Sequence, residues 1–318
     1  ITYSADAQKA TINYIDDTTG KTINSETING HTGEAIADPT EAIANYEKQG
    51  YKLVSDDLAN GASFDNDDKT DQAFYIHLNH NIETITPDKP KTPSDIIPGT
   101  GKHYPSGVDK DDLNKTVTRT INVISPDGKT TTIKQPVTLQ RSATVDDVTG
   151  QITYKAWNTG KWEEYDTPQI SGYTPSPAKV SATTVDGNTQ DQTVNITYSA
   201  NAQKAGIKYI DDDTKETLST DTDNGKGKFG QPITFRTDPA KTIKDYEDQG
   251  YKLVTNNFKT TDTYQADNNK NQFEVHFMHG TTDVTPDKPK TPSDIIPGTT
   301  KHYPSGVDKD DLNKTVTR

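Results

Sequence analysis

The chain has 318 residues, of which 29% are hydrophobic, carries a formal net charge of −13 and contains no cysteine. The negative charge disfavours nucleic acid as a partner, because phosphate backbones are bound by clustered Lys and Arg. The lack of cysteine excludes disulfides and thiolate metal sites. The apolar share lies below the value of about 45–50% that is usual for globular chains, so we expect several small cores rather than one large core.

The most informative feature of the sequence is an internal repeat. A block at 86–119 returns at 285–318, and its two copies differ only where Gly101 becomes Thr300. The segment 1–10 also returns with one change, at 196–205. A self-similar period of about 200 residues indicates a train of independently folded modules.

The repeated block predicts a connector. It contains five prolines at short intervals: Pro87, Pro90, Pro93, Pro98 and Pro105. Proline removes a backbone donor and favours extended structure, so we expect a stiffened spacer here. Ile96, Ile97 and Tyr104 are the side chains in it that can dock on a neighbouring module.

The repeats divide the chain into six parts. We expect residues 1–7 to be the last strand of a preceding module, 8–80 a first-type module, 81–115 a Pro-rich linker, 116–200 a module of a second type, 201–280 another first-type module, and 281–318 a Pro-rich linker followed by the first strand of a further module. Because the chain opens and closes inside repeats, we interpret it as a fragment of a longer array.

The sequence of the first-type module predicts a hairpin, one helix and further strands. Alternation of apolar and polar residues predicts strands, and Asp38, Pro39 and the stop at Gly50 predict a helix between them. The expected elements are strands at 11–15, 21–28, 51–54 and 72–78, and a helix at 38–50. A single helix across a mixed sheet is the β-grasp pattern, and 201–280 repeats it with a helix from Asp238 to Gly250.

The second-type module is richer in strands and shows no equally clear helix, although 143–150 is long enough for a short one. The alternating pattern predicts strands at 116–124, 130–140, 151–157 and 193–198, with a further hairpin between Trp157 and Trp162. The fold class that these patterns predict is therefore β-rich α+β, arranged as tandem small modules.

An aromatic group in the second-type module is the candidate ligand site. Its rings are Trp157, Trp162, Tyr165 and Tyr173, which include both tryptophans of the chain, and Asn158 and Lys161 are the polar residues beside them. Sugar faces stack on indole and phenol rings, while the amide and the ammonium can bond hydroxyls. The alternative is that these rings cover a small core, which small modules need.

Metal sites and catalysis receive little support. Weak calcium binding is conceivable at the acidic turns containing Asp16, Asp17, Asp211 and Asp212, but the full EF-hand order of ligands is missing, so a solvated turn is the simpler interpretation. The pairs His77/His80 and His276/His279 lie on expected strands, where residues three apart point to opposite faces. No pair of carboxylates, nucleophile elbow or phosphate loop stands out, so we expect no enzyme, no cofactor and no resident metal.

The sequence resembles the mucin-binding (MucBP) repeat family of lactobacillus surface proteins. The residues that carry the resemblance are Tyr14–Asp17, Gly50–Val54 and His77, with their repeats Tyr209–Asp212, Gly250–Val254 and His276. The resemblance implies ubiquitin-like β-grasp modules in an elongated rod anchored to the cell wall of a Gram-positive bacterium. It also implies adhesion to host mucin glycoproteins and, for some repeats, immunoglobulin binding.

Three functional hypotheses remain open at this point. The first is a monomeric adhesin in which weak contacts with mucin glycans add through tethering, with no membrane insertion. The second is immunoglobulin capture through an exposed sheet edge or helix face. The third is a stalk without its own ligand. Free sugar competes only in the first case, and a stalk binds nothing specifically.

Overall fold

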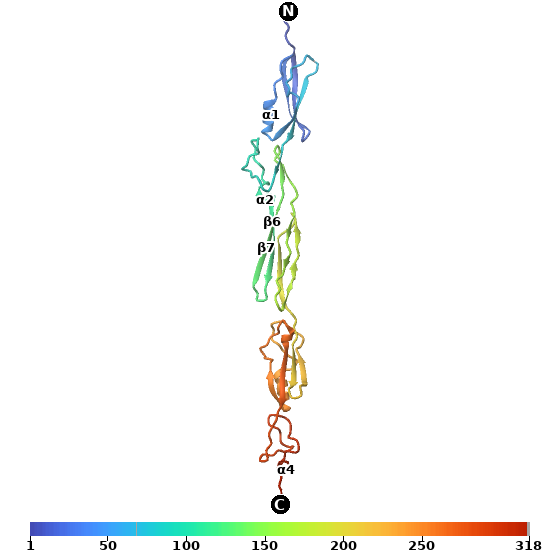
Figure 1. The fold of residues 1–318 in the computed structure, drawn as a ribbon. Coiled ribbons are helices and arrows are strands. Elements are labelled where there is room, and N and C mark those ends of the chain that lie inside the picture. Colours follow the sequence, from blue (N-terminus) through green and yellow to red (C-terminus); the bar gives the residue numbers. More distant parts are fainter. Residues whose placement is uncertain (68, 317–318) are drawn as a thin grey trace. The chain divides into compact units, whose positions relative to one another are not determined.

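The computed structural model describes residues 1–67 and 69–316, and it is a β-rich α+β structure (Figure 1). The chain divides into two compact units. Unit 1 comprises 1–120, 133–164 and 181–193, and unit 2 comprises 121–132, 165–180 and 194–318. No helix in the described part of the chain is long and apolar enough to cross a membrane.

The first module is a mixed four-stranded sheet with one helix. Its elements are β1 (Ala7–Asp16), β2 (Lys21–His31), α1 (Thr40–Glu47), β3 (Tyr51–Asp56) and β4 (Gln72–His80). The strand order is β2-β1-β4-β3, and the central strands β1 and β4 run parallel while the outer pairs are antiparallel. The four predicted strands and the helix are confirmed, with longer strands and a shorter helix. Residues 1–7 were expected to be the last strand of a preceding module, but 1–6 lie outside any strand and Ala7 begins β1.

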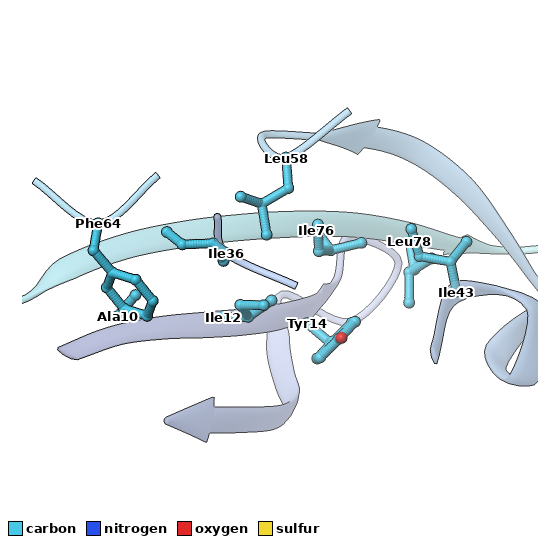
Figure 2. Packing of buried hydrophobic residues seen from close by; sticks show 9 residues of the cluster. All are labelled: Ala10, Ile12, Tyr14, Ile36, Ile43, Leu58, Phe64, Ile76 and Leu78. Carbon is cyan, nitrogen blue, oxygen red and sulfur yellow. The ribbon is translucent and has the colours of Figure 1, made fainter. Parts of the chain in front are cut away.

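The core of this module follows from the alternation in β1 and β4. Every second residue of β1, including Ala10, Ile12 and Tyr14, is buried, because successive strand side chains point to opposite faces. Ile76 and Leu78 of β4 face them, and Ile43 of α1 closes one end (Figure 2). The remaining members of the cluster come from loops: Ile36, Leu58 and Phe64. One face of the sheet is therefore the module core.

The module at 201–280 has the same topology. Its elements are β16 (Gly206–Asp211), β17 (Thr217–Thr222), α3 (Pro239–Asp248), β18 (Tyr251–Asn256), η1 (Asn268–Asn271) and β19 (Gln272–His279). The order β17-β16-β19-β18 repeats the first sheet, with β16 and β19 parallel. Asp238 caps α3 by accepting a hydrogen bond from the Ala240 N–H at 3.0 Å, as the sequence predicts.

The second-type module is built from short strands. They are β6 (Asn114–Ile124), β7 (Thr130–Gln140), β8 (Ala143–Asp146), β9 (Ile152–Tyr154), β10 (Gly160–Trp162), β11 (Tyr165–Asp166), β12 (Tyr173–Ser176), β13 (Lys179–Val180), β14 (Thr183–Val185) and β15 (Gln192–Ala200). The largest sheet has the order β12-β15-β6-β7. Two expectations are wrong here. β10 pairs with β14 rather than forming a hairpin from Trp157 to Trp162, and 143–146 is a strand rather than a short helix.

The segment expected to be a stiffened spacer carries its own packed structure. It contains β5 (Ile82–Ile85) and α2 (Lys110–Leu113), and the second copy of the block contains α4 (Lys309–Leu312). β5 pairs with β8, which pairs with β9. Ile97, Tyr104 and Val108 are at most 2% exposed and pack with Ala143 and Val145. The Pro-rich segment is thus anchored to the next module by four or five apolar side chains. The expected extended spacer does not form.

Candidate functional site

A stack of aromatic rings around an arginine marks the surface of the second-type module. The Arg141 guanidinium carbon lies 3.7 Å from the centroid of the Tyr154 ring and 4.4 Å from that of Trp157. Tyr154 remains 39% exposed. A cation over the face of an aromatic ring is attracted by the ring's quadrupole. We call Tyr154, Arg141 and Trp157 the arginine stack.

The local chain path explains why the arginine stack forms. Arg141 directly follows β7, and its Nε donates to the Asp112 carbonyl at 3.0 Å. Asn158 continues a strand-like pairing beside it: its N–H donates to the Gln140 carbonyl, and its Oδ1 accepts from the Gln140 N–H at 2.8 Å. These bonds fix Trp157, the residue before Asn158, against Arg141. The terminal amino groups of Arg141 make no hydrogen bond to any residue in 1–67 or 69–316.

Trp162 is more deeply buried than Trp157. It is 3% exposed and packs with Val117, Leu139 and Val185. Arg119 lies 5.6 Å from its ring centroid and is itself buried, which lowers the pKa of this guanidinium. Its Nε and Nη1 donate at 2.8 Å to the Gln135 side chain and the Ser181 carbonyl. The ring of Trp162 therefore belongs to the core, while Trp157 packs against the edge of the same cluster and is only partly buried.

The other two predicted ligand residues are at the surface or in the second unit. Lys161 forms an ion pair with Glu163 at 2.8 Å, and both side chains are more than half exposed. Such a pair contributes little to stability and can exchange partners. Tyr165 belongs to β11 in unit 2, where it pairs with Val180 of β13. The structure thus places Trp157 with Arg141 and Tyr154, two residues that the sequence analysis missed, and leaves Lys161 paired with Glu163.

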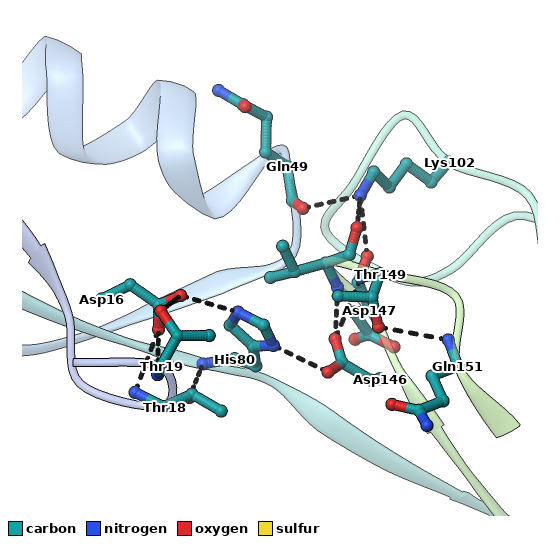
Figure 3. A network of polar contacts seen from close by, with 11 residues as sticks. Asp16, Thr18, Thr19, Gln49, His80, Lys102, Asp146, Asp147, Thr149 and Gln151 are labelled. Atoms are coloured by element: carbon teal, nitrogen blue, oxygen red, sulfur yellow. Dashed lines mark hydrogen bonds and ion pairs between the residues drawn. The ribbon is translucent and has the colours of Figure 1, made fainter. Parts of the chain in front are cut away.

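A second polar site lies where the parallel strands β1 and β4 end together (Figure 3). Asp16 Oδ1 accepts the Thr18 N–H at 2.9 Å, and Asp16 Oδ2 lies 2.7 Å from the Thr19 hydroxyl and 3.1 Å from His80 Nε2. Burial disfavours the charge of Asp16, but the bonds from Thr19 and His80 outweigh burial and keep its pKa below the ordinary value. Asp17 binds a different histidine, His77, at 2.6 Å.

The second copy of this acidic turn has the same contacts. His276 Nδ1 lies 2.8 Å from Asp212, and His279 Nε2 lies 3.0 Å from the buried Asp211. Ligand atoms of Asp211, Asp213 and His279 lie within 4.8 Å of one another, which is close enough for a metal ion. These carboxylates already accept protein donors, whereas calcium requires six to eight oxygens. Calcium binding at Asp16, Asp17, Asp211 and Asp212 stays a prediction.

Comparison with known families matches three segments of the chain. The family described as "Mucin binding domain" matches residues 8–80 and 203–279, and the family described as "Muc B2-like domain" matches residues 108–202. These ranges coincide with the two sheet-and-helix modules and with the strand-rich module between them. No curated protein matches the chain.

Several solved structures are similar to parts of the chain. The type 2 repeat of the mucus binding protein MUB from Lactobacillus reuteri is 29% identical, over 61% of this chain and 100% of that one, with a TM-score of 0.40. Mub-RV is 27% identical over 61% and 99%, with a TM-score of 0.48. The mucin-binding domain of Spr1345 from Streptococcus pneumoniae is 32% identical over 28% and 92%, with a TM-score of 0.26.

Proposed function

Because the chain belongs to the mucin-binding domain family, we propose that it is a non-enzymatic adhesin that binds the glycans of mucins. The observation that carries the proposal is the presence of two mucin-binding domains, at 8–80 and 203–279, on either side of a Muc B2-like domain. A chain with repeated binding domains can contact a ligand with repeated glycans at several points at once. Tethered weak sites raise avidity by orders of magnitude without any strong single contact.

We further infer that each first-type module is a ubiquitin-like β-grasp domain. The support is the sheet order with two parallel central strands and the helix inserted before the third strand in sequence. The elongated rod and the domain limits 8–80, 116–200 and 201–280 are part of the same proposal. Small-angle scattering of the chain tests the rod: a maximum dimension that fits a compact globule would contradict it.

The arginine stack is the proposed glycan contact. Tyr154 and Trp157 offer flat apolar ring faces for the C–H face of a sugar, and the guanidinium between them suits a carboxylate or sulfate on an acidic sugar. Asn158 and Lys161 lie close in sequence and supply polar contacts at the rim. A site of this kind is shallow, so its affinity for one sugar is low and multivalency carries the adhesion.

The proposed location is the cell-wall surface of a Gram-positive bacterium, with the chain exported and facing host mucus. The support is the family and the acidic, cysteine-free composition, which needs no disulfide chemistry to fold. The partners are mucin glycoproteins. Nucleic acid is disfavoured by the net charge of −13.

The proposal is tested by binding of the 318-residue chain to immobilised mucin before and after enzymatic deglycosylation. We expect binding to fall at least about tenfold on deglycosylation, because the glycans supply the repeated contacts. Trp157→Ala is expected to weaken binding by about fivefold or more, in line with roughly 1–3 kcal/mol for loss of a stacked ring.

Tyr75→Ala is the matched control. Tyr75 is an aromatic residue with 43% exposure on β4, outside the arginine stack, so its loss is expected to leave mucin binding unchanged. Binding that survives deglycosylation would contradict the glycan adhesin. Binding to purified immunoglobulin G on a parallel surface, with none to mucin, would favour antibody capture, and no binding to either surface would favour a stalk.

A further inference from the structure

The end of the first module in unit 1 is closed by a loop of the second-type module. The loop 146–150 follows β8, and its backbone reaches Gly50 so closely that a Cβ there would lie 2.4 Å from the Asp147 carbonyl oxygen. Gly50 has φ of +96°, so glycine is required both by the backbone and by the approaching loop. Lys102 Nζ joins the two sides by donating to the carbonyls of Gln49 at 2.9 Å and Val148 at 2.6 Å (Figure 3).

His80 is part of the same closure. Its Nε2 lies 3.1 Å from Asp16, and its Nδ1 lies 2.7 Å from Asp146, the residue that begins the loop. The His80 side chain is only 5% exposed as a result. Asp146 also caps its own loop by accepting the N–H groups of Val148 and Thr149. The histidine is thus enclosed by two carboxylates, one from each module.

The module in unit 2 has the residues that correspond to those contacting the loop in unit 1, but no loop in the described part of the chain covers them. Gly250, Gln249, Lys301, His279 and Asp211 correspond to Gly50, Gln49, Lys102, His80 and Asp16. A groove of about 750 Å³ lies there, and most of these residues line it. A Cβ at Gly250 would meet no atom within 4 Å, although its φ of +98° matches that of Gly50.

Polar groups around the groove are correspondingly open. The His279 side chain is 55% exposed. The Lys301 ammonium donates no hydrogen bond to any residue in the described part of the chain. Residues 281–284, which correspond to β5, form no strand, whereas β5 is paired along its length with β8.

The apolar side of the same surface is less covered than in the first copy, although Tyr303, the counterpart of Tyr104, is buried. Ile97, Val108 and Leu113 are at most 2% exposed, because Ala143 and Val145 of the second-type module cover them. Their counterparts Ile296, Val307 and Leu312 are only partly buried. Burial of apolar surface gives roughly 25 cal/mol per Å², so completing this core is favourable.

We propose that the groove between 248–253 and 279–301 is a docking site for the 143–154 segment of a further second-type module. The partner would add a strand to 281–284, place a loop backbone on Gly250 and a carboxylate on His279, and accept the Lys301 ammonium with its carbonyl oxygens. Backbone pairing along an edge gives affinity, and the charged side chains fix the register.

One contact of the closed end in unit 1 has no equivalent among the described residues of unit 2. Asn81 donates from Nδ2 to Asp147 Oδ2 at 2.5 Å, and the corresponding residue is Gly280. The backbone bond is kept, since Asn81 N–H donates to Gly50 O at 2.9 Å and Gly280 N–H to Gly250 O at 2.8 Å. The backbone bond of the loop itself runs from the Asp147 N–H to the Asn81 carbonyl at 3.0 Å, and the Gly280 carbonyl can accept the same bond from a docked loop, so only the side-chain bond is lost.

The test is a longer chain in which the sequence of residues 120–202 is appended after Arg318, compared with the 318-residue chain. Amide hydrogen exchange at 281–284 is expected to slow at least about tenfold in the longer chain, because a strand forms there. Exchange of the His279 ring C–H is expected to slow as well. Protection of amides in the appended copies of β6 and β7 shows that the added module is folded.

Gly250→Ala in the longer chain is the matched control. A methyl group at this position clashes with a docked loop, so the protection of 281–284 should return to the level of the 318-residue chain. A folded appended module that leaves 281–284 and His279 as exposed as before would overturn the proposal.

A pair of variants in the 318-residue chain tests the contact between Gly50 and the loop, and it does not need the appended module. Gly50→Ala and Gly250→Ala bear the same backbone strain, but only the first meets a loop. Gly50→Ala is expected to speed amide exchange of β5 by more than about tenfold, with a much smaller effect of Gly250→Ala on its own module. Equal effects of the two substitutions would contradict the proposed docking.

Discussion

The two first-type modules end in the same chemical groups but in different surroundings. His80 is 5% exposed and His279 is 55% exposed, although each faces the aspartate that begins its acidic turn. The difference comes from the second-type module, which covers the first end with Asp146 and the following loop. Burial at these positions is therefore set by the neighbour rather than by the module itself. A repeat boundary drawn on sequence alone cuts through a packed interface.

The largest effect is expected from Leu113→Ala compared with Leu312→Ala. Leu113 is 0% exposed in the core that joins the repeated block to β8, while Leu312 is partly exposed. Removing a fully buried leucine side chain costs about 2–5 kcal/mol, and removing a half-exposed one costs much less. Local stability from amide exchange around α2 and α4 measures both. Similar losses at the two positions would show that the block is equally covered in both copies.

The individual strands and helices were predictable because they follow from the local pattern of apolar, polar and capping residues. Alternation in 7–16 and 206–211 gives β1 and β16, and Asp238 with Pro239 gives the start of α3. The packing of the Pro-rich block was predictable only in part: Ile97 and Tyr104 dock as expected, Ile96 stays exposed, and their partners could not be identified. Ile97, Tyr104 and Val108 have no periodic spacing, and their partners lie some 35–55 residues further along the chain.

The candidate site was predictable only in part. The sequence pointed to the segment of Trp157, Asn158 and Lys161, but two tryptophans close together do not reveal which ring faces the core. Trp162 is buried because β10 pairs with β14, a contact set by tertiary structure. Arg141 and Tyr154 were missed for the same reason. The scarcity of arginine in the chain was the one signal that pointed to Arg141.

A smaller effect is expected from Lys102→Met compared with Lys301→Met. Lys102 donates to three carbonyl oxygens in the closed interface, at 2.6 to 2.9 Å. Its loss leaves the partly buried carbonyls of Asp147 and Val148 without this donor, which costs about 1–3 kcal/mol. Lys301 is exposed, so its replacement should change stability by less than about 0.5 kcal/mol. The thermal unfolding temperatures of both variants check this prediction. A Lys102→Met variant as stable as the unchanged chain would show that the lysine does not stabilise the closed interface.

The smallest effect is a pH dependence at the open end. The hydrogen bond to Asp212 raises the pKa of His276 above its ordinary value. A raised folded-state pKa gives stability that is complete below pH 6.5 and is lost as the pH rises through the folded-state value. The module at 201–280 should thus be slightly less stable at pH 8 than at pH 6. In His276→Gln this difference should disappear, and its persistence would assign it to another group.

The most direct test of the closed and open ends is deuterium exchange at the histidine ring C–H, measured by mass spectrometry on the 318-residue chain. His80 is expected to exchange at least about tenfold more slowly than His279, because the loop that begins at Asp146 encloses it. Equal exchange rates at the two histidines would contradict the account, because they would mean that the second-type module does not close the first.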